Sequence, residues 1–269
     1  MTLPRVLIAG GGELGSAVAH RLARSGMELF VVDLENPRCV RREVCFAMVN
    51  SGGSGIVEGM RARKASSADE AVEIAGAGDI PVLAGDFERI AGEIKPDVFV
   101  DARMLKRDQH ISRDLAPLVV GLGPGFTAGR DVDIVIETNR GHDLGRVIYD
   151  GAAEAHTGVP GEVAGFSHER VIRAPESGTF MSRASLGRMV EKGEVLGVID
   201  DTVCVKSGIS GRLRGLVMDG VEVRGGQKIG DVDPRGAGID HRTISDKGRS
   251  VAGGVLEAVM HWWMRERDD

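Results

Sequence analysis

The sequence predicts a mixed α/β protein in which a parallel sheet with helices on its faces precedes a small all-β domain and a C-terminal helix. Three observations predict this fold class. Short apolar runs alternate with helical segments over the first half, as in parallel sheets. A glycine motif joins the first apolar run to the first helix. The last third repeats itself at an offset of 33 residues, with glycines between short apolar runs.

The composition excludes several classes of protein. The chain is 42% hydrophobic and 28% charged, which fits a folded globular protein rather than a disordered one. No apolar run approaches the roughly 18 residues of a membrane span, and the first residues do not form a signal peptide, so we expect no membrane association. The net charge is −6 and no basic block is present, which argues against a nucleic-acid binder.

The cysteines and histidines predict neither a disulfide scaffold nor a metal site. Cys39, Cys45 and Cys204 are odd in number and lie far from CxxC spacing. None of the seven histidines forms an HxxxH or HExxH pair, so we expect no zinc site. Free cysteines fit a reducing compartment, and we therefore expect a cytoplasmic protein.

The first strand, expected at residues 5–9, runs directly into a GxGxxG motif. Gly10 permits the tight turn, Gly12 lets a pyrophosphate approach the backbone, and Gly15 allows close packing of helix on strand. A helix follows to about residue 24, and its N-terminal N–H groups and dipole attract phosphate. This strand–loop–helix arrangement predicts a Rossmann-like, nucleotide-binding domain.

An acidic residue ends the second strand, expected at residues 28–33. Asp33 lies 21 residues after the middle glycine of the motif, and its carboxylate can accept hydrogen bonds from a ribose diol. The predicted cofactor-binding residues in this region are Gly10, Gly11, Gly12, Gly15 and Asp33. The alternative is an inherited phosphate loop that no longer holds a ligand. Arg38, Arg41 and Arg42 follow, either as a clamp for the extra phosphate of NADP or as a solvated basic face.

Further α/β elements are expected up to residue 101. They are a hairpin at 55–63, helices at 68–75 and 87–94, and strands at 81–84 and 97–101. Ser67 begins a capping box for the first of these helices. Asp101 and Lys106 fall at carboxyl ends of strands, where open α/β sheets bind ligands; a loop ion pair is the alternative.

A second glycine-rich loop spans residues 121–129, after an apolar strand at 118–120. Its backbone N–H groups are candidates for an anion-binding nest. The predicted cofactor-binding residues there are Gly121, Gly123, Gly125 and Thr127. A turn that links two domains is the alternative.

Polar side chains gather between the strands expected at 134–136 and 144–148. Asn139 and Arg140 can donate to an oxyanion or phosphate, His142 titrates near neutral pH, and Glu137 is placed to orient the histidine. We therefore predict Asn139, Arg140 and His142 as catalytic residues. A plain hairpin turn also selects asparagine, glycine and aspartate, and it is the alternative.

The internal repeat predicts two small sheets related by pseudo-symmetry. Gly178 matches Gly211, and Gly197 matches Gly230, in a register without gaps. The pattern resembles biotinyl/lipoyl-type barrel-sandwich hybrid domains. Those domains attach their cofactor to a lysine about seven residues before the second Ala-Pro-like dipeptide. Asp200 occupies that position here, and Lys206 falls on the next strand, so we expect no biotin or lipoyl attachment.

A helix is expected at residues 245–267, with an apolar stripe that favours docking on a core; a partner interface is the alternative. The stripe consists of Val251, Val255, Leu256, Val259, Trp262 and Trp263. The resulting domain boundaries are 1–130 for the nucleotide-binding domain, 131–172 for connecting strands and the polar loop, 173–236 for the β repeat, and 245–267 for the helix.

Over nearly its full length the chain resembles the YqeB family of selenium-dependent molybdenum hydroxylase system proteins. The segments that carry the resemblance are residues 10–15, 18–22, 40–42, 117–129, 135–147, 157–162, 173–175 and 230–235. The resemblance implies an accessory role in maturing the cofactor of these hydroxylases, with the apo-hydroxylase as partner. Because the cysteines lie outside these segments, a thiolate-based selenium carrier finds no support.

Three hypotheses for function follow. In the first, a maturation factor binds a nucleotide-bearing ligand such as molybdopterin dinucleotide at the first glycine loop, with the second loop and the polar cluster on the facing wall. In the second, an NAD(P)-dependent oxidoreductase uses His142 as its acid–base group. In the third, a non-catalytic scaffold docks the apo-hydroxylase through its β domain.

Overall fold

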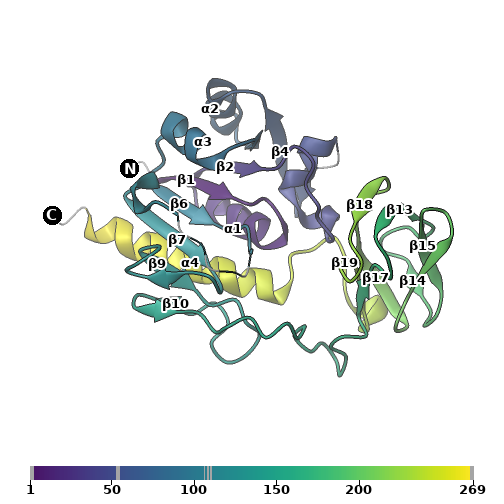
Figure 1. Ribbon diagram of the computed structural model, residues 1–269. Helices are drawn as coiled ribbons and strands as arrows, with labels where there is room; N and C mark the ends of the chain where they lie inside the picture. The colour runs from purple at the N-terminus through teal and green to yellow at the C-terminus, as the bar shows by residue number, and fades with distance from the viewer. Residues whose placement is uncertain (1–2, 53–54, 106, 108, 110, 267–269) are drawn as a thin grey trace. The chain divides into compact units, whose positions relative to one another are not determined.

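The computed structural model describes residues 3–52, 55–105, 107, 109 and 111–266. The chain divides into two compact units. We call residues 1–37, 44–157 and 244–269 the sheet unit, and residues 38–43 and 158–243 the β unit. The predicted fold class is confirmed in its coarse form: a large, mostly parallel sheet, further antiparallel sheets, and a helix near the C-terminus (Figure 1).

In the described part of the sheet unit, nine strands form one sheet. In spatial order they are β10 (Val147–Ile148), β9 (Ile134–Ile136), β7 (Leu118–Leu122), β6 (Val98–Asp101), β1 (Arg5–Ala9), β2 (Glu28–Asp33), β5 (Ile80–Ala84), β4 (Met60–Ala65) and β3 (Ile56–Val57). The strands from β9 to β4 pair in parallel, and β10 and β3 add antiparallel edges. The central strands are continuous apolar runs because helices bury both faces of the sheet.

Two helices cover each face of this sheet. α1 (Glu13–Arg24) and α4 (Asp246–Arg265) pack side by side on one face, where Val18 and Val255 contribute to the same core as Val6 (Figure 1). α2 (Ala68–Gly76) and α3 (Phe87–Ile94) pack on the other face around Phe30. The predicted docking of the C-terminal helix on a core is therefore confirmed.

Polar side chains set the N-termini of three helices. Ser67 Oγ accepts a hydrogen bond from the Glu70 backbone N–H at 3.2 Å, Asp86 caps α3, and Ser245 caps α4. The Glu70 carboxylate completes the capping arrangement on Ser66 rather than on Ser67. The helix after the first glycine loop begins at residue 13, with Gly12 as its N-cap, and ends at residue 24, as expected.

The boundary between the two units lies at a different position from the predicted domain boundaries. The predicted connecting region, 131–172, is split near residue 157, so that β9 and β10 extend the main sheet. β8 (Thr127–Ala128) and β11 (Gly151–Ala152) pair separately as a two-stranded antiparallel sheet. The polar loop predicted as a site therefore belongs to the sheet unit.

The described β unit contains two four-stranded antiparallel sheets. The first is ordered β12 (Val171–Arg173), β19 (Lys228–Asp233), β17 (Gly211–Leu216), β14 (Met189–Val190). The second is ordered β16 (Val203–Lys206), β15 (Val195–Ile199), β13 (Gly178–Ser182), β18 (Val221–Val223). Phe180 and Leu213, which occupy equivalent positions in the two repeats, are fully buried in the shared core.

The pairing of these strands follows the sequence repeat. Gly178 pairs with Val223, and the equivalent Gly211 pairs with Val190, so each sheet takes strands from both repeats. The hairpin between β15 and β16 carries Asp200 and Asp201, both with positive φ. Asp200 Oδ1 accepts a hydrogen bond from the Thr179 N–H at 2.9 Å, which ties the hairpin to β13.

Candidate functional site

Parallel strands bring predicted site residues to one edge of the sheet unit. Gly10 follows β1, Asp33 ends β2, Asp101 ends β6, Gly123 follows β7 and Glu137 follows β9. These strands are neighbours in the order β2-β1-β6-β7-β9, and all run in the same direction. The carboxyl edge of the sheet is therefore the candidate site, since open α/β sheets bind ligands there.

The three motif glycines have three different surroundings. Gly10 has φ +98°, and a Cβ there would lie 2.8 Å from the Ala102 backbone. A Cβ on Gly15 would lie 1.8 Å from the carbonyl oxygen of Gly10. A Cβ on Gly12 would meet no heavy atom within 4 Å. A tight turn, a close helix–strand contact and an open approach to the backbone are what the motif spacing predicts, while ligand binding stays a prediction.

A serine that the sequence reasoning missed holds the loop in place. Ser16 is fully buried, donates through Oγ to the Gly11 carbonyl oxygen and accepts from the Phe46 N–H, each at 2.8 Å. The Ala47 N–H also donates to the Gly11 carbonyl at 3.1 Å. Ser16 directly follows the last glycine of the motif, and a hydroxyl at the first buried turn of the helix is the signal that could have identified it.

Asp33 contacts the glycine loop directly. Its Oδ2 accepts a hydrogen bond from the Gly11 N–H at 2.6 Å, and its Oδ1 accepts one from the Leu34 N–H at 2.7 Å. Burial raises the pKa of Asp33, and these two hydrogen bonds partly oppose the rise. The carboxylate thus fixes the loop, and each of its oxygens keeps a second lone pair for a ribose hydroxyl.

Asp101 forms a buried ion pair at the end of β6. It is fully buried, and its Oδ2 accepts from Arg103 Nε at 2.9 Å. The guanidinium lies 4.3 Å from the centre of the Phe87 ring and also donates to Gln109. The predicted alternative of an ion pair is therefore present, but with Arg103, two residues along the chain. Lys106 lies outside the described residues.

The glycines of the second loop are explained by close packing. A Cβ on Gly121 would lie 2.6 Å from the Phe126 ring, one on Gly123 would lie 2.3 Å from Thr138 Oγ1, and one on Gly125 would lie 2.2 Å from a backbone oxygen. The Gly123 N–H donates to the Ile136 carbonyl at 2.8 Å. The Thr127 N–H donates to Asp131 Oδ2, also at 2.8 Å. Two N–H groups proposed for an anion nest are thus used inside the protein.

The carboxylate of Glu137 organises the polar loop instead of orienting His142. Glu137 is buried and accepts hydrogen bonds from the backbone N–H groups of Thr138, Asn139 and Glu154, at 2.7, 2.6 and 2.7 Å. Because a buried carboxylate needs donors, these three N–H groups stabilise its charge where burial alone would not. His142 is exposed.

Two of the three residues predicted as catalytic, Asn139 and Arg140, are bound to carboxylates further along the chain. The Asn139 side-chain amide donates to Glu154 Oε2 at 2.5 Å. Arg140 binds Asp246, the first residue of α4, through two hydrogen bonds of 2.6 and 2.8 Å. Each of these side chains therefore has a structural contact that stabilises the loop or anchors the helix.

The arginines that follow Asp33 belong to the β unit. Arg41 is buried, and its Nη2 donates to the carbonyl oxygens of His241 and Thr243, each at 3.0 Å. Arg38 is exposed and Arg42 is half-buried. Arg41 therefore anchors the end of the β unit, a role that the NADP hypothesis does not include.

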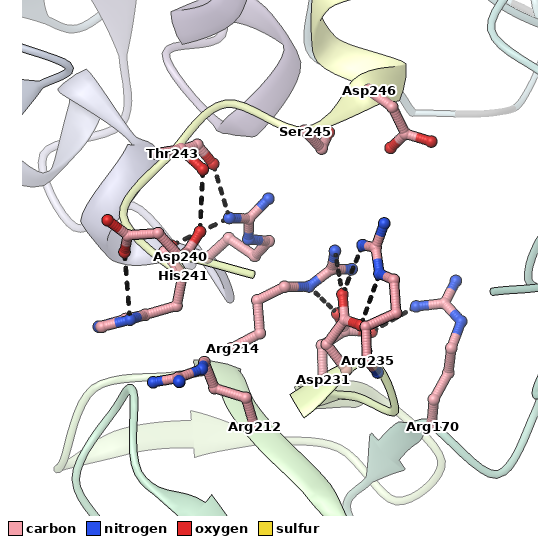
Figure 2. A network of polar contacts seen from close by, with 12 residues as sticks. Arg170, Arg212, Arg214, Asp231, Arg235, Asp240, His241, Thr243, Ser245 and Asp246 are labelled. Atoms are coloured by element: carbon pink, nitrogen blue, oxygen red, sulfur yellow. Dashed lines mark hydrogen bonds and ion pairs between the residues drawn. The ribbon is translucent and has the colours of Figure 1, made fainter. Parts of the chain in front are cut away.

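The β unit contains a buried network of arginines and aspartates that sequence reasoning missed. Arg170 Nη1 and Arg214 Nε donate to Asp231 at 2.7 and 2.6 Å, and Figure 2 shows these side chains with Arg235 around the aspartate. Arg214 also binds Asp233, at 3.1 Å, and Arg235 binds Asp233 at 2.7 Å. Burial opposes the charge of Asp233, but the hydrogen bonds from Arg235 and the charge of Arg214 give a net lowering of its pKa.

The described residues were compared with the requirements of a metal site and of a membrane-spanning helix. Within residues 3–266 and outside the gaps given above, no group of three or more His, Cys, Asp and Glu side chains is arranged to hold a metal ion. None of the helices in the described part of the chain combines the length and the apolar character that crossing a membrane requires.

Comparison with known proteins identifies one relative by sequence. No protein-family model matches the chain. The chain is 45% identical over 255 residues to the uncharacterized protein YqeB of Escherichia coli K12, a match that covers 95% of this chain and 47% of YqeB.

Solved structures give weak likenesses. An aspartoacylase family protein of Mesorhizobium loti is 15% identical, covers 86% of this chain and 85% of its own, and has a TM-score of 0.29. A succinylglutamate desuccinylase/aspartoacylase of Rhodobacter sphaeroides is 16% identical, covers 86% of each chain, and has a TM-score of 0.27. FadB2 of Mycobacterium tuberculosis is 17% identical, with 45% and 41% coverage and a TM-score of 0.25. Likenesses at these TM-scores carry no argument about fold or activity.

The sequence match supports the resemblance to YqeB and leaves the hydroxylase role untested, since that relative is itself uncharacterized. The chain is similar to YqeB over nearly its whole length and spans about half the length of that protein.

Proposed function

We propose that the sheet unit binds a nucleotide-bearing ligand with its pyrophosphate at the loop of residues 10–15. The observation that carries the proposal is the open space at Gly12, the N-cap of α1, where an added Cβ would have no heavy atom within 4 Å. Gly10 and Gly15, on either side, are packed against backbone atoms. An open glycine at a helix N-terminus between two close-packed ones suits a phosphate ligand, because N–H groups and the helix dipole both attract it.

The strand order supports a Rossmann-like assignment for this unit. The order β5-β2-β1-β6-β7-β9 follows the 3-2-1-4-5-6 order of dinucleotide-binding sheets, with β4 added beside β5. In such sheets the ligand lies outside the carboxyl edge, where the order reverses between the first and fourth strands. Gly10 after β1 and Asp101 at the end of β6 flank that position.

Asp33 supports the ribose half of the proposal. Its carboxylate is held by the Gly11 N–H, so a hydroxyl pair bound to it would also be fixed relative to the phosphate loop. A dinucleotide contains both a pyrophosphate and a ribose, and in dinucleotide-binding folds an acidic residue about 20 residues after the glycine motif binds the ribose.

We further propose that the protein acts as an accessory factor in the maturation of selenium-dependent molybdenum hydroxylases. This role comes from the resemblance to the YqeB family, and molybdopterin dinucleotide carries the pyrophosphate and ribose that the loop suits. The two antiparallel sheets of the β unit support a barrel-sandwich assignment, and this unit would dock the apo-hydroxylase.

Calorimetric titration tests the ligand proposal. Molybdopterin dinucleotide, NAD and NADP are titrated into the wild-type protein and into Gly12→Asp protein, whose carboxylate would occupy the open space and repel phosphate. Gly92→Asp is the matched control, since Gly92 lies on α3 and a Cβ there also meets nothing within 4 Å. We expect binding of at least one dinucleotide that Gly12→Asp abolishes and Gly92→Asp preserves. Absence of binding by all three would refute the proposal.

A further inference from the structure

The β unit contains an open, solvent-exposed cavity of about 430 Å³ that none of the functions proposed for the protein uses. Its lining includes Leu186, Gly187, Arg212, Asp240, His241 and Arg242. Figure 2 shows the side chains of Arg212 and His241 close together and apart from the Asp231 network. A volume of this size fits a small metabolite rather than a bare ion.

Arg212 differs from the other arginines of the β unit that Figure 2 labels, because no carboxylate of the described residues pairs with it. Its Nε donates to the Gly236 carbonyl at 3.0 Å and its Nη1 to the Gly187 carbonyl at 2.6 Å. Both acceptors are neutral, so the guanidinium is held in a fixed orientation at the cavity while its charge remains uncompensated. Its remaining nitrogen, Nη2, is available to donate to an anion.

His241 supplies a second, independent sign of a ligand. The side chain is nine-tenths buried, and its Nε2 lacks a hydrogen-bond partner in the described structure. Nε2 lies 3.3 Å from Glu43 Oε2 but outside hydrogen-bonding geometry, while Nδ1 lies 3.6 Å from Asp240 Oδ1. The ring packs on Gly187, where a Cβ would lie 2.3 Å from it. A buried polar atom without a hydrogen-bond partner is costly unless something binds to it.

The charges around the cavity favour an anionic ligand. Glu43 pairs with Arg242 at 3.3 Å, and the Asp240 carboxylate, 60% exposed to solvent, lies 3.6 Å from Nδ1 of His241. Arg212 is a cation at this cavity that has no carboxylate partner among the described residues. An oxyanion placed between Arg212 Nη2 and His241 Nε2 would compensate the charge of the first and satisfy the second.

We propose that this cavity binds the phosphate group of a small phosphorylated molecule. Arg212 donates to the phosphate oxygens through Nη2, and His241 donates through Nε2. The exposed Arg242, whose side chain is 71% accessible, adds positive charge at the mouth. The rest of the cavity accommodates the organic part of the molecule. This site lies wholly within the β unit and does not depend on the glycine loop of the sheet unit.

Titration calorimetry with inorganic phosphate and with ribose 5-phosphate tests the proposal. Both are titrated into the full chain carrying Gly12→Asp, which removes the proposed nucleotide site and separates the two proposals. We expect saturable binding that Arg212→Gln and His241→Gln each weaken about tenfold or more, the loss expected for one charge-assisted hydrogen bond. Arg224→Gln is the control, because Arg224 is exposed on the same unit and does not line the cavity.

Arg212→Gln also removes two hydrogen bonds to backbone carbonyls, so its melting temperature is measured in parallel. If that variant unfolds, binding is measured instead in Arg242→Gln protein. The imidazole ¹⁵N signals of His241, in a chain without substitutions at the cavity, then report whether phosphate reaches the ring. Binding of both probes, or of ribose 5-phosphate alone, supports the proposal and distinguishes a free from an esterified phosphate. Absence of binding by either probe, or equal affinity in wild-type, Arg212→Gln and His241→Gln proteins, overturns it.

Discussion

The α-carbon of Gly15 faces the carbonyl oxygen of Gly10 so closely that a Cβ at residue 15 would stand 1.8 Å from that oxygen. The first turn of α1 therefore rests directly on the loop that precedes it. This contact couples the stability of the sheet unit to the geometry of the candidate phosphate site.

Gly15→Ala should destabilise the protein by about 3 kcal/mol, because backbone atoms must move to admit the methyl group. Urea unfolding followed by circular dichroism measures the change. Gly92→Ala is the control: its Cβ meets nothing within 4 Å, and alanine in a helix is favoured over glycine by about 1 kcal/mol. Equal stability of the two variants would contradict the packing argument.

Asp33→Asn should change the pH dependence of stability. Burial raises the pKa of Asp33 in the folded state, so the folded protein binds this proton more tightly than the unfolded chain does. The contribution of Asp33 to stability is therefore fully present below its unfolded pKa and is lost as the pH rises through the folded pKa. The free energy of unfolding of wild type minus that of Asp33→Asn should fall over that window. A difference that rises with pH would mean that the hydrogen bonds from Gly11 and Leu34 outweigh burial.

Asp233→Asn should give the opposite dependence. The folded pKa of Asp233 is lowered despite its burial, because Arg235 and Arg214 stabilise the carboxylate. Its contribution is present above the unfolded pKa and is lost as the pH falls through the folded pKa. The free energy of unfolding of wild type minus that of Asp233→Asn should therefore decrease on acidification, as measured by chemical unfolding. A difference independent of pH would show that the network does not depend on the charge of Asp233.

The ion pair between Arg140 and Asp246 should contribute about 0.5 kcal/mol of coupling, because Asp246 is 57% exposed and solvent screens the pair. A double-mutant cycle with Arg140→Gln and Asp246→Asn measures it. Sodium chloride at about 1 M should reduce the coupling, since the Debye length then falls to about 3 Å. Coupling that persists unchanged in salt would point to the hydrogen-bond geometry rather than to charge.

Local signals in the sequence predict the elements well. Residues 87–94 form the expected helix because Asp86 caps it and its apolar side chains share one face, and the repeat predicts the equivalent pairing of Gly178 and Gly211. These features depend on neighbours within a turn or on an internal register, and both are visible in the chain.

The candidate site is harder to predict because its contacts cross the sequence. The sequence groups Arg140 with His142, but the carboxylate partner of Arg140 lies 106 residues further along, on α4. The spacing of Glu137 suggests that it orients His142, yet burial directs its carboxylate to three backbone N–H groups. Residue type predicts that a buried charge finds a partner, whereas only the fold determines which one.

The position of α4 in the chain has a consequence for how the protein is made. The sheet unit needs α4 to cover the face that contains Val6 and Val120, but the whole β unit comes before α4 in the order of synthesis. During translation, the part of that face that α4 covers stays exposed while about ninety further residues are added at roughly 5–20 residues per second. The β unit can therefore complete its core before the sheet unit does. A ribosome that stalls before residue 246 would leave a nascent chain with exposed apolar surface that is prone to aggregate.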